Sequence, residues 1–399
     1  MYLDKIKEAR NTIKDVVIKT PIMYSDIFSK ETNNKVYMKC ENLQLTGAYK
    51  LRGALNKLRS LTEEQKSNGV VCSSAGNHAQ GVAYAATLEG VKSKIVMPKT
   101  TPLIKIQSTK NFGGEVVLHG NVYDDAYAEA RRIEEEDGLY FLHPFNDIDV
   151  ILGQGTLALE IFEEIDDIDV IVCPIGGGGL ISGIALAAKE LKPSIKVIGV
   201  QAEGANAMEL SFKKGSLISL DTVSTIADGI AVKVPGDLTY EFIKNYVDDI
   251  VTVSDADIAE SFILLTEKHK LLAEASGVAS LAALKKLNLE NKKIVSIISG
   301  GNIDMVTISA LINSGLVSRG RLFCFSVELP DTPGQLLEIS RILTSVRANV
   351  IQLEHNQFKA IDRLKNVLLE VTVETNGHSH IEMIKNELSR NGYVINHVY

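Results

Sequence analysis

Five short runs of apolar residues, rich in valine and isoleucine, recur along the middle of the chain without polar alternation. They occupy residues 94–97, 115–118, 170–175, 196–200 and 293–298. Segments with helical periodicity lie between them, for example 124–137, 180–191 and 255–269. Strands that are apolar on both faces and separated by helices are typical of parallel sheets covered on both sides. The pattern therefore predicts an α/β fold with two parallel-sheet subdomains: a smaller one over about 50–146, inserted in a larger one that makes up the rest of residues 1–313.

The pattern changes after residue 313. Residues 314–321 contain two glycines and two serines without periodicity, which predicts a linker. The remainder, 322–399, reads in order as strand 322–329, helix from 332 to about 345, strands 348–358 and 367–375, helix 380–390 and strand 393–398. The order βαββαβ in so short a segment predicts a ferredoxin-like module.

Composition limits the classes of partner. The 399 residues carry 42 basic and 50 acidic side chains, a net charge of −8, which argues against nucleic acid and anionic membranes. Because no stretch approaches the length of an apolar membrane span, we expect a cytoplasmic protein. Four widely spaced cysteines, Cys40, Cys72, Cys173 and Cys324, are expected to be buried and reduced.

Four consecutive glycines, Gly176, Gly177, Gly178 and Gly179, follow an apolar strand and precede a helix. Backbone N–H groups without Cβ crowding, at a helix N-terminus, form an anion cradle. Glu203 after the next strand is compatible with a dinucleotide-binding fold instead, but no G-x-G-x-x-G register fits. A Walker motif fails because Ile184 stands where lysine is required. Four glycines suit one phosphate better than a pyrophosphate.

Polar turns end two further strands. After residues 69–72, the turn Ser73–His78 opens a helix, where its N–H groups would bind a carboxylate and Asn77 would donate to a phenolate oxygen. Plain helix capping is the alternative, and His78 is more typical of a structural turn residue. Ser299–Asn302 follows the strand ending at residue 298. A hydroxyl facing a ring nitrogen would be a neutral partner, which favours β-elimination over transamination; a simple loop serine is the alternative.

Lys50 lies where a polar-to-small run, residues 41–54, enters a helix. A lysine in that position is most often solvated. Together with the glycine run and the Ser73–His78 turn, which look built to hold the phosphate and ring of one cofactor, it indicates pyridoxal phosphate held as a Schiff base.

These motifs carry a family resemblance. Residues 49–54, the turn 74–81, the glycine run and residues 299–302 resemble, in order, the fold type II (tryptophan synthase β-like) pyridoxal-phosphate enzymes, and within them the threonine dehydratases, also called threonine ammonia-lyases. The resemblance spans residues 6–313. Tyr49 departs from it slightly, because phenylalanine is commoner before the lysine. The segment 329–336 looks like the opening of an ACT regulatory domain, which accompanies some threonine dehydratases.

The resemblance implies a role for each residue of the motifs. Lys50 would be the Schiff-base lysine and proton-transfer base. The remaining contacts would be Asn77 to the phenolic oxygen, Gly176 to Gly179 to the phosphate, Ser299 to the pyridine nitrogen, and Ser74, Ala75, Gly76 and His78 to the substrate carboxylate. Related serine racemases carry a serine at position 75 as a second base. Alanine cannot transfer a proton, so elimination is favoured over racemisation.

The resemblance also implies a divalent cation, Mg²⁺ or Ca²⁺, at Glu203, the Ala207 carbonyl and Glu209, which are oxygen-only ligands. Two surface carboxylates are the alternative explanation of that spacing. In the ACT module, Asp331 and Gly334 would lie near a small allosteric effector, and such modules pair in homo-oligomers. Isoleucine or valine would be logical end-product inhibitors.

The function implied is α,β-elimination of L-threonine to 2-oxobutanoate and ammonia, and of L-serine to pyruvate, under allosteric control. Phe145 is a candidate contact for the β-methyl group of threonine. The alternatives are an L-serine dehydratase or serine racemase of the same fold, a non-catalytic amino-acid sensor and a nicotinamide oxidoreductase.

Overall fold

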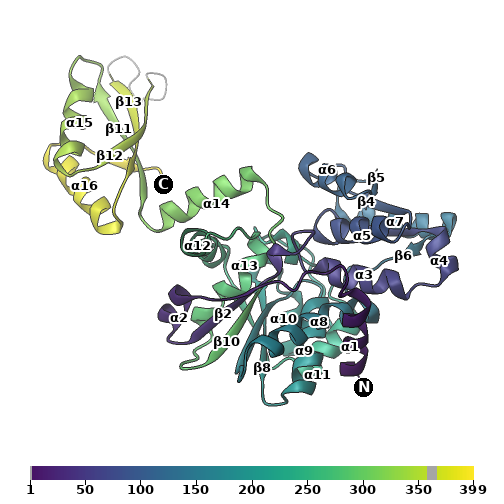
Figure 1. Cartoon of the computed structure of the whole chain (residues 1–399). Helices are drawn as coiled ribbons and strands as arrows, with labels where there is room; N and C mark the ends of the chain where they lie inside the picture. The colour runs from purple at the N-terminus through teal and green to yellow at the C-terminus, as the bar shows by residue number, and fades with distance from the viewer. Residues whose placement is uncertain (1, 357–365) are drawn as a thin grey trace. The chain divides into compact units, whose positions relative to one another are not determined.

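The computed structural model describes residues 2–356 and 366–399. The chain divides into two compact units, Met1–Asp304 (unit 1) and Met305–Tyr399 (unit 2), each of which is described by itself (Figure 1). Within the described residues no helix is both long and apolar enough to cross a membrane.

Unit 1 contains a six-stranded sheet with the order β1-β2-β10-β7-β8-β9. Its strands are β1 (Ile22–Tyr24), β2 (Lys35–Cys40), β7 (Val170–Pro174), β8 (Lys196–Ala202), β9 (Asp249–Val253) and β10 (Lys293–Ile298). All neighbours are parallel except the edge strand β1, which is antiparallel to β2. The neighbouring strands β2 and β10 come from opposite ends of the unit.

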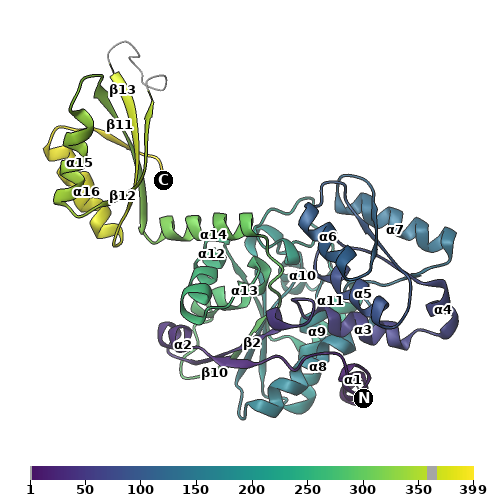
Figure 2. The ribbon, with the colours of Figure 1, turned by 45° about the horizontal axis from the view of Figure 1, so that its top comes forward.

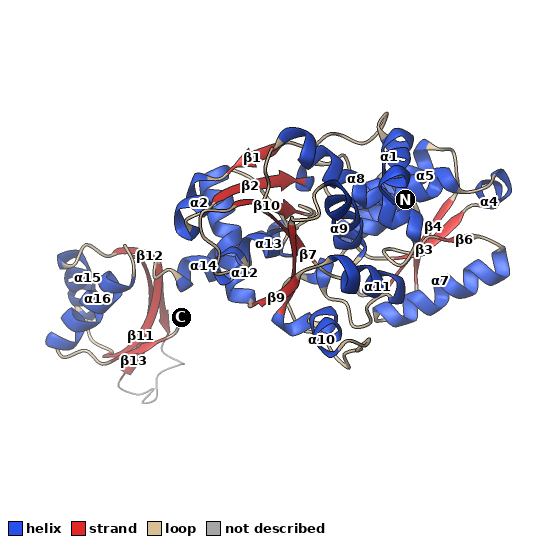
Figure 3. Cartoon of the chain, turned by 90° about the horizontal axis from the view of Figure 1, so that it is seen from below, coloured by secondary structure: helices blue, strands red, loops and turns tan. Residues whose placement is uncertain are grey.

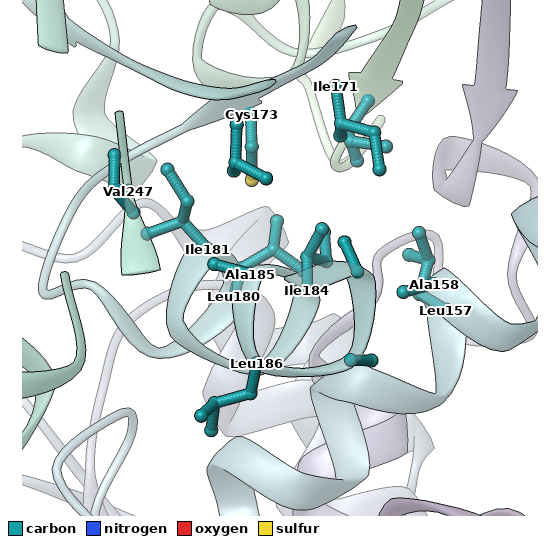
Figure 4. Close-up of a cluster of buried hydrophobic side chains, with 14 of the residues drawn as sticks. Leu157, Ala158, Ile171, Cys173, Leu180, Ile181, Ile184, Ala185, Leu186 and Val247 are labelled. Atoms are coloured by element: carbon teal, nitrogen blue, oxygen red, sulfur yellow. The ribbon is translucent and has the colours of Figure 1, made fainter. Parts of the chain in front are cut away.

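Helices cover both faces of this sheet, with α9 on one side and α13 on the other (Figure 3). The helices of this part are α1 (Tyr2–Ile13), α2 (Asp26–Thr32), α8 (Ile148–Glu164), α9 (Gly179–Leu191), α10 (Ala207–Lys214), α11 (Asp237–Tyr246), α12 (Asp255–Leu264) and α13 (Ala275–Ala282). Ile181, Ile184 and Ala185 of α9 are directed toward β7 (Figure 4). This packing fixes the start of α9 just beyond the end of β7.

A second, four-stranded parallel sheet has the order β5-β4-β3-β6. Its strands are β3 (Val70–Ser73), β4 (Ser93–Met97), β5 (Glu115–Leu118) and β6 (Tyr140–Phe141), and its helices are α3 (Lys50–Ser60), α4 (Glu63–Asn68), α5 (Asn77–Leu88), α6 (Leu103–Asn111) and α7 (Tyr123–Asp137). Val70 and Cys72 pack in one cluster with α3 and α5, whereas Val71 packs with α7. Successive side chains point to opposite faces, so burial of both faces explains the unbroken apolar runs. The predicted α/β class with two parallel sheets is confirmed.

Unit 2 has four antiparallel strands in the order β12-β13-β11-β14, with both α15 and α16 on one face (Figure 2). Its elements are α14 (Met305–Ser318), β11 (Leu322–Pro330), α15 (Gln335–Ser345), β12 (Asn349–Asn356), β13 (Asn366–Glu374), α16 (His378–Arg390) and β14 (Ile395–His397). After α14 the order is βαββαβ, as predicted for a ferredoxin-like fold. Positions 357 and 358 of one predicted strand lie outside the described residues.

The predicted linker 314–321 requires a correction. Residues 314–318 continue α14, and only Arg319–Arg321 form the turn into β11. Ile308, Leu311 and Gly315 are buried at helical spacing, and burial of such a stripe outweighs the weak helical preference of glycine and serine. Short helical turns complete the secondary structure: η1 (Glu41–Leu43), η2 (Glu203–Ala205), η3 (Asp228–Ile230), η4 (Leu265–His269) and η5 (Leu284–Lys286).

Candidate active site

The motif residues converge at the carboxyl ends of strands from both sheets of unit 1. Residues 74–77 follow β3, the glycine run follows β7, and residues 299–302 follow β10. Loops that leave the carboxyl ends of parallel strands share one edge of a sheet, which is where α/β proteins place their ligands. The topology therefore explains why segments more than two hundred residues apart in sequence meet.

Backbone hydrogen bonds attach the segment before α3 to the loop after β10. Ala48 forms an antiparallel bridge with Gly300, the Tyr49 N–H donates to the Ser299 carbonyl (3.1 Å), and the Gly301 N–H donates to the Gly47 carbonyl (2.8 Å). Ser299 is buried at this junction. Main-chain contacts thus hold Tyr49, the residue before Lys50, against Ser299.

The Lys50 side chain is half-buried, and a hydrogen bond orients its amine. Its Nζ donates to the Pro144 carbonyl at 2.8 Å. Burial lowers the pKa of Lys50 to about 8, although the Glu274 carboxylate acts in the opposite direction. An amine with a pKa near 8 is neutral in about a tenth of the molecules at pH 7, far more than an ordinary lysine, and the neutral form is the one that acts as a nucleophile or a general base.

The lowered pKa predicts how the apoprotein reacts with an aldehyde. Because only the neutral amine attacks, the rate of covalent capture of pyridoxal phosphate should rise with pH through about 8 and then level off. A solvated lysine would instead keep gaining reactivity up to its ordinary pKa near 10.4. Borohydride trapping followed by mass spectrometry of the Lys50 peptide measures the rate. A rate still rising steeply well above pH 8 would contradict the lowered pKa.

The glycine run forms a tight turn with no room for side chains. A Cβ built on Gly177 would lie 2.3 Å from the Phe145 ring, and Gly178 has a φ of +97°. The Thr239 hydroxyl donates to the Gly177 carbonyl at 2.6 Å, which fixes the turn. The first N–H groups of α9 have no partner within the helix, and with the bare turn they provide a cradle that fits one phosphate. Phe145 therefore packs on this cradle.

We predict that Gly177→Ala weakens the binding of pyridoxal phosphate on the order of tenfold, since the methyl group must displace the Phe145 ring. Equilibrium dialysis of the apoprotein against the cofactor measures the dissociation constant. The double variant Gly177→Ala/Phe145→Ala has space for the methyl group and should recover part of the affinity. Equal affinities for all three proteins would show that the Phe145 contact does not shape the cradle.

The turn after β3 is partly open. Residues 74–77 are half-buried, and a Cβ built on Gly76 would meet no atom within 4 Å. The Ser74 hydroxyl accepts a hydrogen bond from the Gly76 N–H at 3.2 Å. His78, by contrast, is buried and donates from Nε2 to the Leu142 carbonyl at 2.9 Å, and burial lowers its pKa to about 3. His78 is therefore neutral and brings no positive charge to an anionic ligand.

Sequence reasoning missed two residues of this site, Glu274 and the side chain of Asn302. Asn77 donates to a Glu274 carboxylate oxygen at 2.6 Å and accepts from Asn302 at 2.8 Å. Burial, together with the like charge of Asp228, raises the pKa of Glu274 to about 7. One feature of the sequence could have pointed to Glu274. It is the single acid in the apolar run 271–279, and it stands directly before a helix.

A buried ionic network supports the segment that carries Lys50. Arg52, two residues further along α3, forms hydrogen-bonded ion pairs with Glu41 (2.8 Å) and Glu160 (2.6 Å). The Lys39 ammonium forms a second ion pair with the Glu160 carboxylate, at 2.6 Å. Burial alone would raise the pKa of Glu41, but Arg52 holds it below its ordinary value. The network therefore contains two cations and two anions and is neutral.

The two carboxylates predicted to bind a divalent cation face different lysines. Glu203 lies 3.5 Å from the Lys286 ammonium, and Glu209 pairs with Lys213. The Ala207 carbonyl accepts from Ser211. Among the described residues no cluster of three or more metal-binding side chains occurs. The arrangement therefore does not present a set of oxygen ligands for Mg²⁺ or Ca²⁺, and the cation stays a prediction from resemblance.

Asp331 and Gly334 lie in unit 2, in the exposed turn between β11 and α15. Gly334 has a φ of +100° and precedes the first residue of α15. A Cβ built on it would meet no atom within 4 Å, so this turn is open.

An amine with a lowered pKa, a glycine cradle and a fixed amide donor together define a site for a phosphorylated aldehyde cofactor. The comparisons agree with that class: residues 13–300 match the model of the family described as pyridoxal-phosphate dependent enzyme, and the chain belongs to this family. It is 46% identical to an L-threonine ammonia-lyase of Thermotoga maritima over 394 residues, 98% of each chain.

Solved structures agree on the fold. The processed form of threonine deaminase isoform 2 from Solanum lycopersicum superposes with a TM-score of 0.76 at 37% identity, over 78% of this chain and 92% of that one. Maize serine racemase superposes with a TM-score of 0.75 at 38% identity, over 80% and 98%. The predicted fold type II class is confirmed, and membership of this family leaves the nicotinamide oxidoreductase alternative without support.

Proposed function

We propose that this protein is a pyridoxal-phosphate dependent ammonia-lyase that converts L-threonine to 2-oxobutanoate and ammonia, and L-serine to pyruvate. The observation that carries the proposal is the half-buried Lys50 amine, 2.8 Å from the Pro144 carbonyl, on a segment whose main chain is bonded to the loop after β10. The near full-length similarity to an L-threonine ammonia-lyase supports the choice of substrate.

Pyridoxal phosphate, when bound, supplies an electron sink that weakens the Cα–H bond of an amino acid. Lys50 would hold the cofactor covalently and would take the Cα proton of the substrate. Gly176 to Gly179 would hold the phosphate, and Asn77 would donate to the phenolic oxygen. Ser299 would be the neutral partner of the ring nitrogen. Loss of the β-hydroxyl as water leaves a 2-aminoalkenoate, which tautomerises and hydrolyses to the 2-oxo acid and ammonia.

The half-buried turn Ser74–Gly76 is the candidate position for the substrate carboxylate. Ala75 lies in this turn, so the turn offers no side chain there that could protonate the opposite face of the substrate. This favours elimination over the racemase alternative.

The function is tested with purified protein supplied with pyridoxal phosphate, by measuring 2-oxo acid release from L-threonine and L-serine in parallel. We expect faster formation of 2-oxobutanoate. Dominant pyruvate formation would assign the protein as an L-serine dehydratase, and appearance of D-serine by chiral chromatography would favour a racemase. If cofactor is bound but neither 2-oxo acid nor D-serine forms, the non-catalytic sensor becomes the better description.

Unit 2 is proposed to act as an ACT-like regulatory module. Its open turn at Asp331 and Gly334 is the candidate position for a small effector. Strand β12 is at the edge of the sheet, and Val350, Ile351 and Leu353 on it are exposed. An exposed apolar edge strand is a template for pairing with another chain, which supports a homo-oligomer.

A further inference from the structure

Glu274 is an acid in an apolar environment. It precedes α13, is 7% exposed, and its neighbours in sequence, Ala273 and Ala275, are buried. Its N–H donates to the Gly300 carbonyl at 3.0 Å. A Cβ built on Gly300 would lie 2.5 Å from a Glu274 carboxylate oxygen, so the carboxylate rests directly against the loop that carries Ser299.

A structural role as a helix cap does not account for this acid. Glu274 occupies the N-cap position of α13, yet its side chain makes no capping hydrogen bond. Its carboxylate instead accepts a hydrogen bond from the Asn77 amide nitrogen at 2.6 Å, across 197 residues of sequence. A short hydrogen bond to an ionised acceptor is among the stronger kinds in proteins.

The oxygen of the Asn77 side-chain amide also has a hydrogen-bond partner. Its Oδ1 accepts from Asn302 Nδ2 at 2.8 Å, and the same Asn302 nitrogen donates to the Thr46 carbonyl at 2.7 Å. A flipped Asn77 amide would bring two NH₂ groups together and place its oxygen against the Glu274 carboxylate. The network therefore admits one orientation. In that orientation one hydrogen of Asn77 Nδ2 goes to Glu274, and the second is left to donate elsewhere.

We propose that Glu274 is a positioning residue for the cofactor: its carboxylate takes one hydrogen of the Asn77 amide and thereby directs the other toward the phenolic oxygen of pyridoxal phosphate. The inference rests on the proposed function, since it uses the cofactor role of Asn77. The proposal adds Glu274, a buried acid directly before α13, to the residues that position the cofactor ring.

The charged groups around Glu274 determine when this hydrogen bond is strong. Burial makes the largest contribution to the pKa of Glu274 and raises it, as Asp228 does, whereas the Asn77 amide, the Ser276 hydroxyl and the more distant Lys105 lower it; the result is about 7. Lys105 and Asp228 form an ion pair with each other (2.6 Å). The charge of Glu274 also raises the pKa of Lys50. Above pH 7 the carboxylate is ionised and is the better acceptor; below it the acid is protonated and Asn77 is held less firmly.

The test measures cofactor binding rather than activity alone. In Glu274→Ala, Asn77 loses its acceptor, and the dissociation constant of the apoprotein for pyridoxal phosphate should rise on the order of tenfold. Glu274→Gln keeps an oxygen acceptor of the same shape without charge. It should retain most of the affinity, while the dependence of the affinity on pH around 7 disappears. Glu290→Gln, an exposed acid, is the matched control and should behave as the wild type.

The melting temperature of each apoprotein shows that it is folded, and the near-isosteric Gln variant keeps the test valid if the Ala variant does not fold. Wild-type affinity and pH dependence in both Glu274 variants would overturn the positioning role and leave the proposed function intact. A wild-type protein that does not bind pyridoxal phosphate would overturn both. A Gln variant with the pH profile of the wild type would assign the titration to another group and overturn the charged role of Glu274.

Discussion

Replacing Lys50 by alanine should abolish 2-oxo acid formation, a loss of at least about 10³-fold in kcat. The variant lacks both the amine that binds the cofactor covalently and the base that takes the Cα proton. The product assay with L-threonine measures the loss. Mass spectrometry after borohydride treatment should show no cofactor on the protein.

Two further variants separate the chemistry of Lys50 from its charge. Lys50→Arg keeps a cation, but the guanidinium is not deprotonated in proteins and cannot act as a base, so it should be as inactive as Lys50→Ala. Lys92→Ala removes an exposed lysine and should leave turnover unchanged. Substantial activity in Lys50→Ala would refute the assignment of Lys50 and, with it, the proposed mechanism.

Replacing Arg52 by methionine should lower the free energy of unfolding by about 3–5 kcal/mol. Methionine fills much of the space but leaves Glu41 and Glu160 facing each other with only Lys39 as a counter-charge. Removing one partner from a buried ion network lowers the free energy of unfolding, because the remaining charge stays buried without compensation. Urea unfolding of the full-length protein, followed by circular dichroism, measures the change in midpoint and slope.

The control for Arg52 is an arginine with similar partners at the surface. Arg132 pairs with Glu129 and Glu136 on α7, with about half of its side chain exposed. Arg132→Ala should cost only about 0–1 kcal/mol, since solvent screens such pairs. An Arg52→Met variant no less stable than Arg132→Ala would show that the buried network contributes little to stability. The network also adjoins the helix that carries Lys50, so loss of cofactor affinity should accompany the loss of stability.

Much of the fold could be predicted from the sequence, because strands that are buried on both faces consist of consecutive apolar residues. Val70, Val71 and Cys72 form an unbroken apolar run since helices cover both faces of their sheet. The glycine run and the residues around Lys50 and Ser299 were recognisable because each follows a strand or opens a helix, and parallel topology brings such ends together. The prediction was wrong at 314–318. The glycine and serine residues there suggested a linker, but the segment continues a helix that is stabilised by burial of one of its faces.

The contacts within the site were harder to predict, because they depend on the third dimension. Glu274 meets Asn77 only after the chain has built both sheets, and no local pattern links the two residues. The Pro144 carbonyl that orients Lys50 is a backbone atom, which sequence composition does not reveal. For the predicted cation ligands, the family resemblance implied a common site, whereas the side chains of Glu203 and Glu209 pair with different lysines.

The pairing of β2 with β10 has a consequence for synthesis of the protein. The four strands of the smaller sheet lie within residues 70–141 and can pair early, but the centre of the larger sheet needs residues 293–298. Roughly a hundred and twenty residues separate the end of β7 from the end of β10, so translation at ~5–20 residues per second leaves apolar β7 without its neighbour on that side for on the order of ten seconds. We expect the nascent chain to depend on chaperones during that interval, and the active site to form last.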